Sequence, residues 1–152
     1  MIKITIKIRV RYGETDQMGV VYNANYIRYL EIARTELLRK VGLPYKEIEK
    51  KGFLLPVYET FIRHKAPARY DDILEVEASY KDLKSPVVHI DYKITNNSKL
   101  ILEGYTKHPF IDKISYKPQK PPHFFIEALN EYFLDDTEYD LTNREVHSEI
   151  FL

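Results

Sequence analysis

The chain has 152 residues, enough for one domain with a substantial hydrophobic core and too few for two full domains. Its 23 Lys and Arg residues balance its 23 Asp and Glu residues, so no overall charge favours nucleic acid or an anionic membrane as a partner. The lack of cysteine excludes disulfides, thiolate nucleophiles and cysteine-based metal sites. No apolar run reaches the roughly 18 residues of a membrane span and no signal-peptide core is present, so we expect a cytoplasmic protein.

The N-terminal part of the chain predicts one strand and a polar turn. Residues 2–10 alternate isoleucine or valine with lysine, threonine or arginine, which is the period of a half-buried β-strand. Residues 14–19 are polar and turn-capable, and they contain Asp16. The regular strand is therefore expected to end before this turn.

A long amphipathic helix is predicted next. Asn23 is a residue type that caps helix N-termini, because its side chain can accept from unpaired N–H groups. From Tyr26 to Val41, apolar residues recur at spacings of three and four, with charged residues on the other faces. Gly42 followed by Pro44 predicts the end of the helix. The apolar stripe is broad enough to need a whole sheet to cover it.

The rest of the chain predicts mainly strands. Residues 45–51 are expected to form a short helical turn, and Pro56 implies an edge or a bulge at the start of the strand that follows. Gly104 is expected to mark a bulge in the last strand. The four strands predicted after the helix span residues 53–66, 74–81, 88–95 and 100–111.

A run of hairpins after a single long helix predicts an α+β fold, with about five antiparallel strands wrapped around that helix. A stiff proline-rich linker at residues 117–122 precedes a short amphipathic helix around residues 125–132. The tail, residues 135–152, is polar until its apolar end at residues 150–152. We expect this tail to be disordered or to pack on a neighbouring subunit.

Several stretches of the chain resemble a known family. The run TDQMGVVYNANY, continuing as IRYLEIARTELLRKVGLPY, resembles the signature of hotdog-fold acyl-CoA thioesterases of the 4-hydroxybenzoyl-CoA thioesterase type, including their bacterial acyl-CoA thioesterase branch. HKAPARYDDILEVEASY and GYTKHPFID resemble later strands of that family. The resemblance implies a hotdog domain over residues 1–134, and the tail from residue 135 lies outside it.

Thioester hydrolysis needs a base or nucleophile and donors that stabilise the oxyanion, and the turn before the helix could supply both. Asp16 could attack the carbonyl or activate water, and the resemblance assigns catalysis to the aspartate at this position. Backbone N–H groups around Tyr22, Asn23 and Ala24 are the candidate oxyanion donors, aided by the helix dipole. In the simpler interpretation, Asp16 is a turn residue hydrogen-bonded to its own backbone.

Asn23 is the main departure from the family. Many relatives have histidine there, whereas an amide can orient a carbonyl or water but cannot exchange a proton at neutral pH. Glu31 could be a second acid, although a solvated or salt-bridged partner for Arg28 or Arg34 is the simpler interpretation. The histidines at positions 64, 89 and 108 lack metal-ligand spacing, so no metal site is predicted.

Coenzyme A carries phosphates, so cations should gather near the mouth of the cleft. The candidates are Arg63, Lys65 and Arg69 at the second turn, and Lys81 and Lys84 at the third; cations at strand ends are usually just solvated. Coenzyme A is part of the substrate, and no separate cofactor is predicted.

The sequence also predicts assembly. A sheet wrapped on one helix leaves an edge strand to be covered, so a homodimer or homotetramer is expected, and relatives place the active site at the subunit boundary. Two alternatives to the acyl-CoA thioesterase stay open. One is a non-catalytic acyl-CoA or acyl-carrier-protein binding module, and the other is a hotdog dehydratase or hydratase, which Asn23 disfavours.

Overall fold

The structure, a computed structural model, describes residues 1–145. Its helices are α1 (Asn23–Lys40), α2 (Tyr45–Lys50) and α3 (His123–Asn130), with two 3₁₀ turns, η1 (Tyr12–Glu14) and η2 (Glu131–Phe133). Its strands are β1 (Ile2–Arg9), β2 (Phe53–Leu54), β3 (Glu59–His64), β4 (Ile73–Tyr80), β5 (Val87–Asn96), β6 (Lys99–Asp112), β7 (Pro118–Gln119) and β8 (Tyr139–Asp140). None of the helices within these residues is long and apolar enough to cross a membrane.

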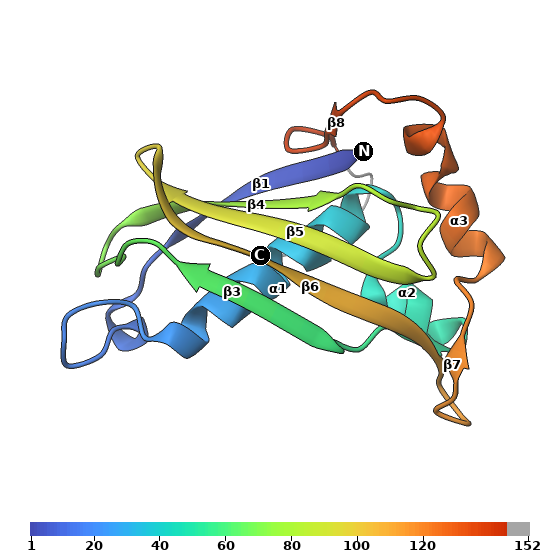
Figure 1. Cartoon of the computed structure of the whole chain (residues 1–152), viewed down its shortest axis with the longest axis horizontal. Helices are drawn as coiled ribbons and strands as arrows, with labels where there is room; N and C mark the ends of the chain where they lie inside the picture. Colours follow the sequence, from blue (N-terminus) through green and yellow to red (C-terminus); the bar gives the residue numbers. More distant parts are fainter. Residues whose placement is uncertain (146–152) are drawn as a thin grey trace.

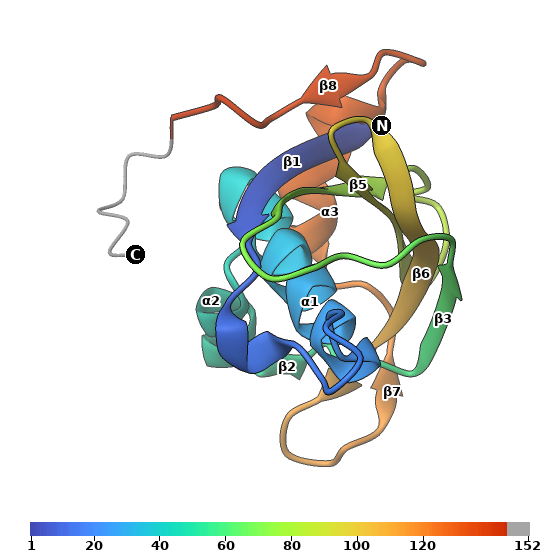
Figure 2. The same ribbon diagram turned by 90° about the vertical axis from the view of Figure 1, so that its left-hand side faces the viewer.

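The strands form one curved, mainly antiparallel sheet that wraps around α1 (Figures 1 and 2). Its order is β2-β6-β5-β4-β1-β8, and β3 and β7 also pair with β6. Five of the eight strands are long, and three have only two residues. The predicted α+β hotdog arrangement, with one long helix inside the sheet and a short C-terminal helix, is confirmed.

The core lies between α1 and the concave face of the sheet. Successive strand residues alternate between the two faces, so every second residue of β4 and β5 is buried against the helix. The helix contributes its apolar stripe, in which Tyr29 is buried and Ile27 is exposed; the buried residues are Tyr26, Tyr29, Leu30, Ala33, Leu37 and Leu38. This packing fixes the helix relative to the sheet, and with it the turn that precedes the helix.

The start of α1 differs from the prediction. Asn23 is the first helical residue, and Tyr22 is the N-cap, with no capping hydrogen bond from its side chain. The preceding turn supplies the contacts instead, because the Tyr22 N–H donates to the Glu14 carbonyl and the Asn25 side chain donates to the same oxygen. The predicted capping role of Asn23 is therefore wrong, and its side chain stays exposed.

The strand predicted at residues 53–66 is split into β2 and β3, with Pro56 in the gap, as a residue without an N–H donor would require. The bulge expected at Gly104 is wrong, because the register shift between β5 and β6 lies at Ile94 and Thr95. A Cβ on Gly104 would come within 2.1 Å of the Phe61 carbonyl oxygen. The glycine therefore allows β3 to approach β6 closely.

The described part of the tail packs on its own chain, so the expectation of disorder is wrong for residues 135–145. β8 pairs in parallel with Ile2 and Lys3 of β1. Leu141 is buried, and the Thr5 N–H donates to the Thr142 hydroxyl at 2.9 Å. The apolar end predicted at Ile150, Phe151 and Leu152 lies outside the described residues.

Candidate active site

Asp16 lies in a tight turn between η1 and α1. Its N–H donates to the Val20 carbonyl at 2.9 Å, and its Oδ1 accepts from the Met18 N–H at 2.8 Å. Gly19 has a φ of +75°, which the turn needs and which favours glycine. The turn bond is the one expected from the simpler interpretation. It occupies only Oδ1, and Oδ2 has no hydrogen-bond partner within residues 1–145.

The N-terminus of α1 offers two of the three predicted N–H donors. The Tyr22 N–H already donates to the Glu14 carbonyl at 2.9 Å, so it is not available to an oxyanion. In the described part of the chain, the N–H groups of Asn23 and Ala24 have no carbonyl partner, as expected for the first turn of a helix. The partial positive charge of the helix end adds to them.

A cavity of about 480 Å³ joins this turn to the end of β3. Its walls contain Asp16, Met18, Val20, Val21, Tyr22, Asn23, Tyr26, His64, Lys65, Ala66 and Pro67. The cavity wall therefore brings together the predicted candidates Asp16, Tyr22, Asn23 and Lys65, whereas Ala24 is not among the lining residues.

His64 is a cavity residue that the sequence analysis did not assign to the site. It ends β3, and its ring packs against Tyr26 with 5.4 Å between ring centroids. The helix stripe and the alternation of β3 do not place His64 in the cavity by themselves, because its position also depends on the pairing of β3 with β6. In that register, His64 faces Leu102, a buried residue. An imidazole in the cavity matters because its two ring nitrogens can donate or accept hydrogen bonds there.

The predicted phosphate-binding cations do not gather in one place within the chain. Arg69 lies over the Asp16 turn, where its guanidinium donates to the Gly19 carbonyl at 3.3 Å. Arg63 pairs with Glu103 at 3.4 Å, and Lys81 pairs with Asp91 at 3.0 Å. Lys81 and Lys84 belong to the β4–β5 connection, at the opposite end of the sheet from the start of α1 (Figure 1).

The chain matches the model of the thioesterase-like superfamily over residues 10–129. It belongs to this superfamily. This chain is 39% identical over 113 residues to YneP of Bacillus subtilis, and the match covers 74% of this chain and 82% of YneP. It is 30% identical over 125 residues to the acyl-CoA thioester hydrolase YbgC of Escherichia coli, covering 82% and 93% of the two chains.

Solved structures agree with the family. The crystal structure of a DHNA-CoA thioesterase from Staphylococcus aureus superposes on this thioesterase-like protein with a TM-score of 0.78 and 28% identity. The superposition covers 91% of this chain and 99% of the other. The resemblance on which the sequence analysis relied is therefore confirmed.

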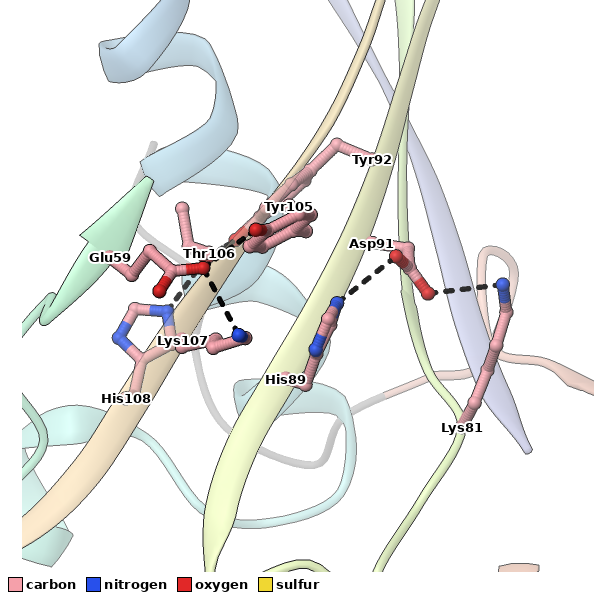
Figure 3. Close-up of polar contacts among 9 residues, drawn as sticks. All are labelled: Glu59, Lys81, His89, Asp91, Tyr92, Tyr105, Thr106, Lys107 and His108. Carbon is pink, nitrogen blue, oxygen red and sulfur yellow. Dashed lines mark hydrogen bonds and ion pairs between the residues drawn. The ribbon is translucent and has the colours of Figure 1, made fainter. Parts of the chain in front are cut away.

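The same thioesterase-like protein also holds a buried polar chain, whose members do not line the cavity; Figure 3 shows Tyr92, Thr106 and His108. The Arg34 guanidinium donates to the Tyr92 hydroxyl at 3.3 Å, Tyr92 and Thr106 lie 2.8 Å apart, and Thr106 lies 2.7 Å from His108 Nε2. His108 Nδ1 lies 3.1 Å from the Pro56 carbonyl. Burial, together with the charge of Arg34, lowers the pKa of His108 to about 4, so this imidazole is neutral.

Glu31 does not join the site. Its side chain is exposed on α1, and Arg34, one of its two predicted partners, instead donates to Tyr45 and Tyr92. His89 lies on the outer face of the sheet, 3.3 Å from Asp91. In the part of the chain that the structure describes, Asp16 is thus the one carboxylate in the wall of the cavity.

Proposed function

We propose that this protein is an acyl-CoA thioester hydrolase, which converts an acyl-CoA and water into a carboxylic acid and coenzyme A. Membership of the superfamily and the similarity to YbgC over most of both chains support the reaction class. The observation that supports the proposal at the level of residues is the cavity, whose lining includes the Asp16 carboxylate and Asn23, the first residue of α1.

In the proposed mechanism, Asp16 uses its unbonded Oδ2 in one of two ways. It either attacks the thioester carbonyl and forms a mixed anhydride, or it removes a proton from an attacking water. The carbonyl oxygen becomes an oxyanion that accepts from the Asn23 and Ala24 N–H groups. The C–S bond then breaks, and the thiolate of coenzyme A leaves. Water hydrolyses the anhydride in the first route.

We propose that His64 is a second catalytic residue and carries the proton. Asn23 cannot exchange a proton, whereas the family resemblance puts histidine at this position in many relatives. His64 lines the same cavity from β3 and can supply an imidazole from another element. In this scheme, Asn23 orients the substrate and His64 relays the proton.

Binding of coenzyme A and assembly are further parts of the proposal. Of the five cations from the sequence, Lys65 and Arg69 lie beside the Asp16 turn and suit the phosphates best. Arg63 and Lys65 both pair with Glu103 at 3.4 Å, whereas Lys81 and Lys84 would need another subunit or a different path of the ligand. We propose a homo-oligomer, because β3 is an edge strand with exposed apolar side chains such as Phe61, whereas β1 is partly covered by β8. Light scattering would measure the mass of the assembly in solution.

The decisive experiment measures thiol release from short, long and aromatic acyl-CoAs by wild type, Asp16→Asn and Asp82→Asn. Asp82 is a matched control, because its Oδ1 accepts from the N–H two residues later at 2.8 Å, as that of Asp16 does. We expect Asp16→Asn to lower kcat about 100-fold or more and Asp82→Asn to leave it unchanged. His64→Gln should lower kcat less and change its dependence on pH.

The alternative, a non-catalytic acyl-CoA binding module, makes the opposite prediction. Its supporting observation is the hydrogen bond from the Met18 N–H to Asp16, which gives the carboxylate a structural task. No turnover on any substrate, with saturable acyl-CoA binding by wild type and Asp16→Asn alike, would support that module and contradict the hydrolase.

A further inference from the structure

The hairpin that joins β6 to β7 projects from the end of the molecule opposite the start of α1 (Figure 1). The pairing of β5 with β6 reaches only as far as Val87 and Pro109. Beyond that pair, β6 continues to Asp112 with only the two-residue strands β2 and β7 beside it. The turn of this hairpin is formed by residues 113–117, which we call the hairpin tip.

The hairpin tip exposes two large apolar side chains. Ile114 is 90% exposed, more than any other large apolar residue in the described part of the chain, and Tyr116 is 71% exposed. Water disfavours apolar surface of this kind, so burying it against a partner would be favourable. Because the hairpin projects from the sheet, its tip can reach such a partner before the rest of the molecule does (Figures 1 and 2).

The backbone holds the tip in one shape and places a tyrosine where it is not favoured locally. The Asp112 carboxylate accepts from the Ile114 and Ser115 N–H groups at 2.9 and 2.7 Å. Tyr116 has a φ of +58°, in the left-handed region that disfavours bulky side chains. The hairpin between β5 and β6 has only asparagine and serine at its left-handed positions. The tip thus carries an aromatic ring that the turn itself does not require.

Lysines surround these apolar side chains. Residues 113–126 contain Lys113, Lys117 and Lys120 and no Asp or Glu. All three lysines are exposed, and within residues 1–145 none of them forms an ion pair. Lys51 adds a fourth exposed cation at the base of the hairpin, because the carbonyl of the next residue accepts from the Lys113 N–H at 2.9 Å. A chain with no net charge therefore has a local excess of positive charge here.

We propose that the hairpin tip is a docking site for a membrane surface rich in anionic lipids. Ile114 and Tyr116 would enter the boundary between headgroups and acyl chains, where a tyrosine ring is particularly favourable. The lysines would remain at the level of the lipid phosphates, attracted by the negative potential of the surface. Such binding is peripheral and reversible, because two side chains bury little apolar area. The proposal does not depend on the reaction proposed above.

Two other partners fit the hairpin tip less well. A symmetric contact with a second copy of the chain would place the lysines of one tip against the same lysines of the other, and like charges repel. A nucleic acid would attract the lysines but would leave the exposed isoleucine beside phosphates and water. An anionic bilayer suits both the positive charge and the apolar side chains.

The first test measures co-sedimentation of the full chain with vesicles of phosphatidylcholine alone and of an equal mixture of phosphatidylcholine and phosphatidylglycerol. We expect the chain to bind the anionic vesicles, and more weakly as salt is added. Replacing the three hairpin lysines by glutamine should weaken this binding about 100-fold. The matched control replaces Lys7, Lys93 and Lys99, three exposed lysines on other parts of the sheet, and should bind like wild type.

The apolar part of the proposal has its own pair of variants. Ile114→Ser should weaken binding to the anionic vesicles about tenfold, because the buried side chain is lost. Leu134→Ser is the control, since Leu134 is 74% exposed but lies outside the hairpin, and it should have no effect. Tyr116→Asn should also weaken binding without loss of stability, because asparagine tolerates a positive φ.

The second test places a fluorescent probe at the tip. The chain has no tryptophan, so one introduced by Ile114→Trp reports on its own surroundings. We expect its emission to shift to shorter wavelength on the anionic vesicles and to be quenched by nitroxide-labelled lipid, whereas Leu134→Trp should show neither change.

Several results would overturn the proposal. They are absence of binding to the anionic vesicles, equal binding by wild type and Ile114→Ser, and an Ile114→Trp emission that lipid nitroxides do not quench. If vesicles are not bound and Ile114→Ser lowers the mass of the assembly in light scattering, the tip is a contact between copies and the membrane proposal is refuted. Thiol release from acyl-CoAs is a separate measurement, so the hydrolase and the docking site fail independently.

Discussion

Residues 105–108 of β6 alternate between the two faces of the sheet, and the two sets of polar side chains have opposite surroundings (Figure 3). Thr106 and His108 point inward and are buried. They belong to the polar chain of hydrogen bonds that begins at Arg34, the inner chain. Tyr105 and Lys107 point outward, where both contact Glu59 at 2.6 and 3.0 Å. The bonds have similar lengths, but only the inner groups have lost water.

The direction of the hydrogen bonds in the inner chain follows from the two groups at its ends. Arg34 can only donate and the Pro56 carbonyl can only accept, so Tyr92 and Thr106 must each pass a hydrogen bond toward His108. This order requires His108 to carry its proton on Nδ1 and to accept on Nε2. A protonated His108 would also donate from Nε2, which would leave one hydroxyl proton, of Tyr92 or of Thr106, without an acceptor among these groups. The outer groups can exchange partners with water, so no such order is imposed on them.

The largest effect is expected where the inner face leaves no room. Gly104→Ala would place a Cβ 2.1 Å from the Phe61 carbonyl oxygen and force β3 away from β6. We expect a loss of about 3 kcal/mol in the free energy of unfolding, measured by chemical denaturation. Gly13→Ala is the control, because nothing lies within 4 Å of its added methyl group. Equal stability of the two variants would contradict this packing.

Acid should destabilise the inner chain next. The pKa of His108 is about 4 in the folded protein against 6.5 when exposed, so the unfolded state binds more protons between these values. Stability from this group is complete above pH 6.5 and is lost as pH falls toward 4, by about 3 kcal/mol.

The free energy of unfolding, measured from pH 7 to pH 4, checks this dependence. His108→Gln should remove this part of the slope, and His89→Gln, on the outer face, should keep it. A slope that is identical in His108→Gln and wild type would refute the buried neutral histidine.

Tyr92→Phe tests the middle of the inner chain. It removes the acceptor of an Arg34 N–H and the partner of Thr106, and leaves both buried. We expect a loss of about 2 kcal/mol, the usual cost of an unsatisfied buried polar group, in urea denaturation. A loss no larger than that of an exposed substitution would show that water reaches these groups.

Tyr105→Phe, on the outer face, should have the smallest effect. Its hydroxyl bond is the main cause that holds the pKa of Glu59 below its usual range, so the variant should raise that pKa. An NMR titration of the Glu59 carboxyl group would measure the change, and the denaturation midpoint should not move. A clear loss of stability here would remove the distinction between the two faces.

The sequence alone determined the order of the long elements and placed Asp16 in a polar turn before the helix. Alternation at residues 2–10 and the stripe on α1 specified a strand and a buried helix face, because these local patterns decide which residues leave water. Pro56 predicted an edge or a bulge, and the structure has a break between β2 and β3 there, since proline has no N–H to donate. The family signature around Asp16 also depends only on consecutive residues.

The tertiary structure decided what depends on distant segments. His64 joins Asp16, and Arg28 and Tyr70 join β1, only because strand pairing and helix packing bring them together. The local sequence predicted a bulge at Gly104, because the reason for this glycine, the close approach of Phe61, lies 43 positions away in the chain. His108 and His89 are the same residue type on strands of one sheet, and only burial beside Arg34 makes one of them a fixed neutral acceptor.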